Sequence, residues 1–180
     1  STALPEQVAD AVVQSAFRSA GQRCSALRLL CLHEGIADHV IEMIQGAAKE
    51  LVAGNTAELA TDLGPVIDAE AFEGITRHLQ RLHAQARPLL PAAAPAATTL
   101  PNLIPPQMFE VKAIADVKAE IFGPVLQVVR WGGDPMAVIQ QINALGYGLT
   151  LGIQTRIDSR AQALAAAARV GNVYVNRNMI

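Results

Sequence analysis

Two cysteines carry the strongest nucleophilic chemistry in this sequence, and their surroundings differ. Cys31 lies between two leucines in an apolar segment, which is typical of a buried structural cysteine. Cys24 instead lies among small and polar residues just after a helix stop at Gly21. A thiol becomes reactive where it is exposed and close to positive potential, which Arg23 and nearby backbone N–H groups could supply. Cys24 is therefore the candidate catalytic nucleophile, and an inert structural cysteine is the alternative.

A cysteine–histidine enzyme would also need a histidine base, and none of the histidines has a context typical of one. We interpret each of the four as a solvated surface residue, namely His33, His39, His78 and His83. The spacings between the two cysteines and between the last two histidines are not those of zinc ligands, so no metal site is predicted. A thiol acyltransferase or hydrolase remains an alternative that would require a histidine within reach of Cys24.

A second group of chemically informative residues is Glu-Ile-Phe-Gly-Pro at positions 120–124. The Gly-Pro pair by itself indicates a turn that enters the next strand. Glu120 and Phe122 are less typical of a turn, because a carboxylate can bind a ribose diol and an aromatic ring can lie against a flat heterocycle. Neither of the common glycine-rich phosphate-binding motifs occurs. The phosphates of a dinucleotide would therefore be held by another part of the protein.

The overall composition excludes several classes of protein. A length of 180 residues fits one domain, and 51% hydrophobic residues suffice for a buried core. A net charge of -2 without any basic block argues against a nucleic-acid partner. No apolar run is long enough to span a bilayer, and no signal peptide is visible. Two cysteines do not make a disulfide framework, which favours a reduced cytosolic compartment.

Helices and strands that would position these residues alternate along the sequence. Apolar spacing, caps and stops predict helices over 4–20, 36–51, 68–86, 134–145 and 158–171, the last of them capped by Asp158 and ended by Gly171. Apolar and β-branched runs predict strands over 27–33, 103–111, 125–131, 149–155 and 173–176. The strand over 103–111 is expected at a sheet edge or at a bulge because it contains two prolines, and residues 88–101 are expected to form an exposed loop around a short strand. The alternation predicts an α/β fold, an open, mostly parallel sheet flanked by helices.

Several motifs in order resemble the aldehyde dehydrogenase superfamily. Residues 19–25, Ser-Ala-Gly-Gln-Arg-Cys-Ser, resemble its nucleophile motif, and residues 120–125 resemble its Glu-x-Phe-Gly-Pro motif. Residues 62–66, 145–149 and 171–176 are similar to further segments of the family in the same order. The resemblance covers essentially the whole chain and implies the three-layer catalytic domain of that family.

A narrower resemblance is to the dehydrogenase half of bacterial proline utilization A proteins, through residues 17–20, 22–28 and 176–180. That half is a delta-1-pyrroline-5-carboxylate dehydrogenase, which oxidises L-glutamate γ-semialdehyde to L-glutamate with NAD. The resemblance therefore implies proline catabolism as the setting. The alternatives are an aldehyde dehydrogenase of another substrate class and a non-catalytic α/β module for oligomer contacts.

The family mechanism implies a role for each matching residue. Cys24 would add to the aldehyde and pass through a hemithioacetal to a thioester, with its backbone N–H helping to hold the oxyanion. Glu120 would bind the hydroxyls of the nicotinamide ribose, and Phe122 would contact the nicotinamide side. Ser25 and Arg23 would bind substrate, Ser25 through the substrate carboxylate. A helix-start hydroxyl is an equal alternative for Ser25.

The resemblance also implies parts of an enzyme that this sequence lacks. The asparagine of the oxyanion site, the general-base glutamate and a Rossmann-type cofactor domain would precede residue 1, and a substrate-anchoring loop would follow residue 180. We expect residues 1–180 to be one catalytic domain of a longer cytoplasmic bacterial polypeptide that forms homo-oligomers. A proline dehydrogenase domain with FAD is expected on the same chain, and the full-length protein could associate peripherally with a membrane. The 180-residue piece alone is expected to be inactive.

Overall fold

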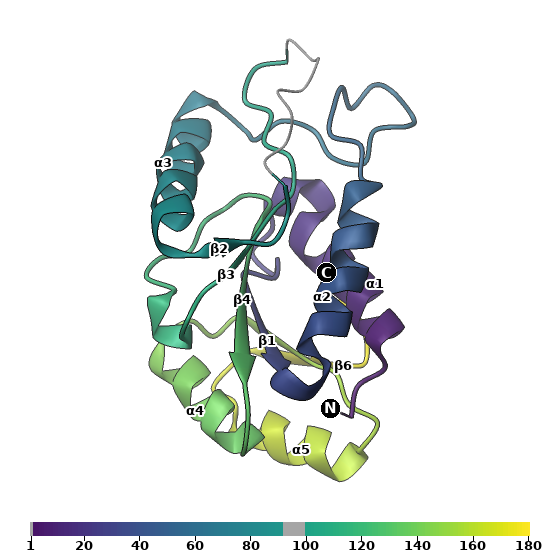
Figure 1. Ribbon diagram of the computed structural model, residues 1–180, viewed down its shortest axis with the longest axis vertical. Helices are drawn as coiled ribbons and strands as arrows, with labels where there is room; N and C mark the ends of the chain where they lie inside the picture. Colours follow the sequence, from purple (N-terminus) through teal and green to yellow (C-terminus); the bar gives the residue numbers. More distant parts are fainter. Residues whose placement is uncertain (1, 92–99) are drawn as a thin grey trace.

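The computed structural model describes residues 2–91 and 100–180, in which helices surround two sheets (Figure 1). The α-helices are α1 (Pro5–Phe17), α2 (Glu34–Lys49), α3 (Ala69–Gln85), α4 (Pro135–Ala144) and α5 (Asp158–Ala167). Two short 3-10 helices are η1 (Arg18–Gly21) and η2 (Ile114–Asp116). The strands are β1 (Leu29–His33), β2 (Arg87–Pro88), β3 (Gln107–Glu110), β4 (Val125–Trp131), β5 (Thr150–Ile153) and β6 (Asn172–Val175).

The strands divide between a four-stranded sheet, in the order β1-β4-β3-β2, and a two-stranded sheet of β5 and β6. β1 and β3 both run parallel to β4, and β5 runs parallel to β6. Only the short β2 is antiparallel to its neighbour, β3. The predicted α/β fold with mostly parallel strands is confirmed.

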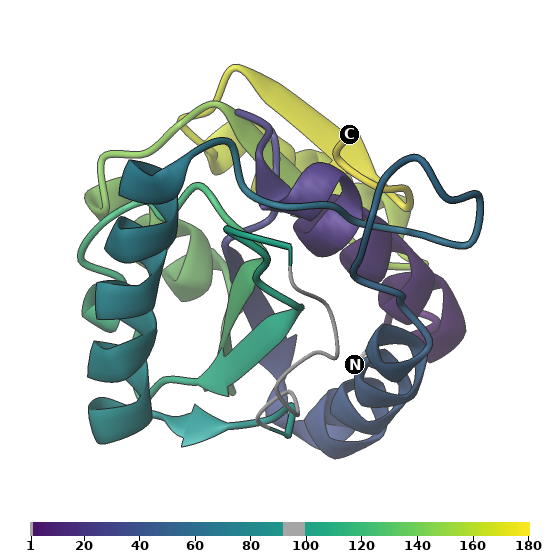
Figure 2. The ribbon, with the colours of Figure 1, turned by 90° about the horizontal axis from the view of Figure 1, so that it is seen from above.

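The central strand β4 is buried on both faces, and its alternating side chains feed two cores. Leu126 and Val128 pack in a cluster with α1 and α2. Val125 and Val129 point the other way, into a cluster with α3. The ribbon seen from above places α3 on one side of the strands, and α1 and α2 on the other (Figure 2). The sequence of a parallel strand that is covered on both faces is mostly apolar, which is why this strand was predictable.

Two of the predicted helix starts are confirmed by their caps. The Asp68 carboxylate accepts a hydrogen bond from the backbone N–H of Ala71 at the start of α3. The Asp134 carboxylate accepts one from Met136 at the start of α4. The predicted cap of α5 is wrong, because Asp158 is already the first helical residue and its side chain makes no cap. That helix also ends at Ala167, four residues before the predicted glycine stop.

Of the two positions expected for the strand over 103–111, an edge or a bulge, the edge is wrong. β3 lies between β4 and β2, and its register with β4 begins at Gln107, so both prolines precede the paired residues. The loop predicted over 88–101 is only partly exposed, because Leu89 and Leu90 are buried against α2 and its neighbours. The remainder of that loop, 92–99, lies outside the described residues.

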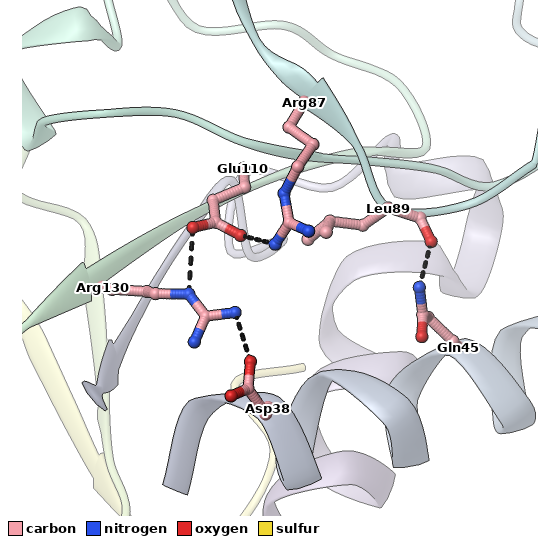
Figure 3. A network of polar contacts seen from close by, with 6 residues as sticks. All are labelled: Asp38, Gln45, Arg87, Leu89, Glu110 and Arg130. Carbon is pink, nitrogen blue, oxygen red and sulfur yellow. Dashed lines mark hydrogen bonds and ion pairs between the residues drawn. The ribbon is translucent and has the colours of Figure 1, made fainter. Parts of the chain in front are cut away.

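A polar network joins the strands β2, β3 and β4 to helix α2 (Figure 3). The Glu110 carboxylate accepts hydrogen bonds from Arg87 and from Arg130, the latter at 2.9 Å. Arg130 also donates to Asp38 of α2 at 2.7 Å. Burial alone would raise the pKa of Glu110, but the hydrogen bonds and charges of the two arginines outweigh it and hold that pKa below its usual value.

Candidate active site

Cys24 lies on a turn between helix α1 and strand β1, where its side chain is exposed. The predicted helix over 4–20 ends early, at Phe17, because the next residues leave the right-handed region. Ser19, Ala20 and Gly21 have φ angles of 56°, 52° and 65°. These three left-handed residues reverse the chain before Cys24. Such backbone is costly for residues with a Cβ and tends to occur at functional sites.

The Glu-Ile-Phe-Gly-Pro segment docks directly against this turn. A Cβ built on Gly21 would lie 2.2 Å from the carbonyl oxygen of Gly123, so the two backbones are in contact. Glu120 and Phe122 sit beside that contact with exposed side chains. The Glu120 backbone N–H donates to the Tyr147 hydroxyl at 3.1 Å. The structure thus brings together three segments that the sequence separates widely.

A fourth segment reaches the turn through Gln22. Its side-chain oxygen accepts a hydrogen bond from the backbone N–H of Ile67 at 2.8 Å, and its amide nitrogen lies 3.5 Å from the carbonyl oxygen of Pro65. The Gly-Pro segment over 62–66 is therefore packed beside the turn that carries Cys24. No role had been assigned to Gln22 from the sequence.

Arg28 is the residue that joins these parts and that sequence reasoning missed. Its guanidinium donates to the carbonyl oxygens of Gly21 at 2.6 Å, Arg23 at 3.1 Å and Gly123 at 3.2 Å. Its Nε lies 3.6 Å from a carboxylate oxygen of Glu120. A sequence signal existed, since Arg28 is the one charged residue in the otherwise apolar run over 26–32.

The Arg28 guanidinium also lies against an aromatic ring and is largely shielded from water. Its central carbon is 4.8 Å from the ring centroid of Phe122, a cation–π distance. Burial lowers the pKa of Arg28 below its ordinary value, while the nearby charge of Glu120 acts in the opposite direction. A guanidinium stays protonated in proteins, so a positive charge lies among the candidate site residues.

A cavity of about 470 Å³ is lined by several of the same residues. Cys24, Glu120 and Phe122 contribute to its wall together with Arg28 and Tyr147. Most of its remaining lining comes from β1, β5 and the helices that pack on them. Cys24 thus has access to a space in which a small molecule could dock.

The two predicted substrate-binding residues, Arg23 and Ser25, are absent from the lining of this cavity. Arg23 is exposed and donates to the Ser19 hydroxyl at 3.2 Å. Ser25 is half-buried on the same turn. Their proposed contact with substrate stays a prediction.

Three of the histidines have other partners. His33 ends strand β1, where its Nδ1 accepts a hydrogen bond from the Gly35 N–H and its ring lies edge-on against Trp131. His83 packs edge-on against Phe109. The interpretation of His78 as a solvated residue is wrong, because it is 8% exposed and its Nδ1 lies 3.1 Å from Arg81. This arrangement does not favour a cysteine–histidine enzyme.

Residues 2–91 and 100–180 contain no cluster of three or more histidine, cysteine, aspartate or glutamate side chains that could hold a metal ion. No helix in these two ranges combines the length and the apolar character that crossing a membrane demands.

Known proteins resemble this chain over nearly its full length. The bifunctional protein PutA of Klebsiella aerogenes is 48% identical over 186 residues, which is 100% of this chain and 14% of the relative. A 1-pyrroline-5-carboxylate dehydrogenase of Halalkalibacterium halodurans is 30% identical, over 94% of this chain and 33% of its own length. The present chain therefore spans about a seventh to a third of these curated relatives.

Solved structures agree with the sequence comparison. A bifunctional proline utilization A protein superposes with a TM-score of 0.94 at 49% identity, covering 99% of this chain and 18% of the other. A 1-pyrroline-5-carboxylate dehydrogenase from Thermus with bound NAD superposes with a TM-score of 0.90 at 30% identity, over 99% and 34% of the two chains. The model of the aldehyde dehydrogenase family matches residues 2–180, and the chain belongs to that family.

Proposed function

We propose that this chain is the nucleophile-bearing catalytic domain of an NAD-dependent enzyme that oxidises L-glutamate γ-semialdehyde to L-glutamate. The observation that carries the proposal is the exposed Cys24 on a turn that contacts the Glu120–Phe122 segment through Gly21 and Gly123. The substrate class follows the names of the relatives, which are PutA proteins and 1-pyrroline-5-carboxylate dehydrogenases. Ser25 and Arg23 are proposed to bind the carboxylate end of the substrate.

The chemistry starts at the Cys24 sulfur. The thiolate adds to the aldehyde carbon to form a hemithioacetal, whose oxygen is held in part by the Cys24 backbone N–H. Bound NAD supplies the acceptor for the hydride that leaves this carbon. The resulting thioester on Cys24 is hydrolysed by water, which releases L-glutamate and restores the thiol. When NAD is bound, Glu120 would hold the hydroxyls of the nicotinamide ribose and Phe122 would contact the nicotinamide side.

The side chains present fit such a cofactor. Glu120 is 40% exposed, so its carboxylate oxygens can accept hydrogen bonds from ribose hydroxyls. Phe122 is 46% exposed. Covering such a large apolar side chain with a ligand is favourable, because it removes apolar surface from water. Both line the same cavity as Cys24. A structural relative from Thermus, aligned over 99% of this chain, carries bound NAD.

We also propose that residues 1–180 act as part of a longer polypeptide. That polypeptide would supply a Rossmann-type cofactor domain, the general-base glutamate and the oxyanion asparagine, and a proline dehydrogenase domain with FAD. Relatives three to seven times longer support this. The strands β1 and β5 support it too, because each lies at the edge of its sheet and both line the apolar cavity. A cytoplasmic homo-oligomer is the proposed form of the whole protein.

The test uses the full-length polypeptide that contains this chain. Formation of NADH from L-glutamate γ-semialdehyde should be readily measured, and Cys24→Ala should abolish it. The matched control is Cys31→Ala, which should retain most of the activity because Cys31 lies within strand β1. Undiminished NADH formation by Cys24→Ala would refute the proposal, and so would a wild-type protein that reduces no NAD with any aldehyde.

A further inference from the structure

We propose that Arg28 is a positioning residue, which holds the cofactor-binding side chains Glu120 and Phe122 in a fixed relation to the turn that carries Cys24. The inference rests on the proposed function and deepens it. Arg28 lies four residues after the nucleophile and just before strand β1. Its contacts reach both motifs, and no other described residue is hydrogen-bonded to backbone on both sides of the Gly21–Gly123 contact.

The Arg28 guanidinium is hydrogen-bonded to backbone carbonyls of both segments. Nη1 donates to the carbonyl oxygens of both Gly21 and Gly123, and Nη2 donates to that of Arg23. The carbonyls of Gly21 and Arg23 lie on the turn just before Cys24, whereas that of Gly123 lies on the cofactor motif 95 residues away. A planar guanidinium can satisfy acceptors in several directions at once, and a lysine ammonium on a flexible stem cannot reproduce that geometry.

Arg28 also lies against the two side chains that are proposed to bind the cofactor. Phe122 lies against the guanidinium, with its ring centroid 4.8 Å from the central carbon. The Glu120 carboxylate is 3.6 Å from Nε, an ion-pair distance that is too long for a good hydrogen bond. Nε is buried and has no hydrogen-bond partner among the described residues. Glu120 is thus attracted to Arg28 while its oxygens remain able to accept ribose hydroxyls.

The Arg28 side chain is itself largely shielded from solvent. The Arg28 side chain is 14% exposed, against 40% for Glu120. A largely buried charge with three carbonyl acceptors has little freedom to move, so it can serve as a fixed point for its more exposed neighbours.

The test compares Arg28→Met and Arg28→Lys with the wild type in the full-length enzyme. We expect Arg28→Met to raise the KM for NAD about tenfold or more, the size expected when charge-assisted contacts are lost. The KM for the aldehyde should change much less, and kcat should fall because Cys24 and the cofactor site lose their mutual alignment. Arg28→Lys keeps the charge but not the planar fork, so it should restore only part of the loss.

Two further measurements separate positioning from general stability. Adding guanidinium at concentrations far below denaturation should partly restore NAD binding to Arg28→Ala, whereas the same concentration of sodium chloride should not. Combining Arg28→Met with Glu120→Gln should raise the KM for NAD by less than the product of the two separate effects, since Arg28 acts through Glu120. The matched control is Arg77→Met, an exposed arginine of α3 paired only with Glu73 at 3.8 Å, which should leave the KM for NAD unchanged.

The outcomes distinguish this inference from the proposed function. Normal wild-type turnover, together with an unchanged KM for NAD in folded Arg28→Met and Arg28→Lys, would overturn the role of Arg28 alone. Absence of NAD-linked turnover in the wild type would overturn the proposed function and this inference with it. If Arg28→Met fails to fold, Arg28→Lys decides the question, and equal effects of Arg28→Lys on both KM values would contradict positioning.

Discussion

Gly21 and Gly123 touch backbone to backbone, and this contact joins the Cys24 turn to the Glu-Ile-Phe-Gly-Pro segment. A Cβ on Gly21 would lie 2.2 Å from the Gly123 oxygen and 3.0 Å from that of Ala16. Gly21 also has a φ angle of 65°, which residues with a Cβ rarely adopt. A side chain of any size at Gly21 would therefore separate the two halves of the candidate site.

The Gly21→Ala variant should accordingly lose both stability and activity. Left-handed strain and the backbone clash together should lower the free energy of unfolding by more than about 2 kcal/mol. Gly46→Ala is the matched control, because Gly46 is exposed within helix α2 and a Cβ there meets nothing within 4 Å. It should stabilise by about 0.5–1 kcal/mol. Denaturant unfolding of both variants checks this, and a neutral Gly21→Ala would contradict the close contact.

The two cysteines should differ sharply in their reaction with iodoacetamide near neutral pH. Cys24 is exposed, whereas burial raises the pKa of the Cys31 thiol to about 12 and leaves almost no thiolate. We expect Cys24 to alkylate at least about 100-fold faster than Cys31. Mass spectrometry of the digested protein would report both rates, with the unfolded protein as the control in which both react readily. Comparable rates in the folded protein would show that Cys24 is not the accessible thiol.

Local signals in the sequence predicted most of the elements but not all of their ends. Asp68 and the Asp134–Pro135 pair give correct helix starts, because a capping carboxylate acts on residues only two or three positions away. Asp158 has the same residue type in a similar context, yet it lies inside its helix. The early end of α1 could not be foreseen either, since Ser19 and Ala20 are not residue types that favour the left-handed region they adopt.

The candidate site was predictable only where a residue's own neighbours gave a signal. Cys24 was identified by its polar surroundings, and Glu120 and Phe122 by their poor fit to a simple turn. Arg28 was missed because its partner Gly123 lies 95 residues away, and no periodicity connects them. His78 was misplaced for a related reason, since a helical histidine is buried or exposed according to what packs on that helix face.

Glu110 should make the protein less stable in acid. Arg87 and Arg130 hold the pKa of Glu110 below its unfolded value, despite the opposing effect of burial. The folded state therefore gains stability above the unfolded pKa of about 4.3, and loses it as the pH falls through the lower folded pKa. Glu110→Gln should lower the free energy of unfolding at neutral pH by about 1–3 kcal/mol and weaken this acid dependence.

The matched control for Glu110 is Glu73→Gln on helix α3. Glu73 and Arg77 form an exposed pair at 3.8 Å, so its loss should cost no more than about 0.5 kcal/mol. Urea unfolding at neutral pH and below about pH 4 compares the two variants. Equal losses for Glu110→Gln and Glu73→Gln would mean that the network in Figure 3 contributes no more than an ordinary surface pair.

His78 should add a second acid dependence at higher pH. Burial, with a smaller contribution from the charge of Arg81, lowers the pKa of His78 to about 4. The unfolded chain takes up this proton near pH 6.5, so the contribution of His78 to stability is complete above that value. As the pH falls towards the folded pKa, stability should drop by up to about 1.4 kcal/mol per pH unit.

The His78→Leu variant should remove this dependence, because leucine cannot titrate and the His78 Nε2 has no hydrogen-bond partner to lose among the described residues. Its unfolding midpoint in urea should therefore vary less than that of the wild type between about pH 6.5 and 4. The control is His39→Gln on an exposed position of helix α2, which should change the unfolding free energy by less than about 0.5 kcal/mol. Parallel curves for the wild type and His78→Leu would mean that His78 takes up its proton as readily in the folded chain as in the unfolded one.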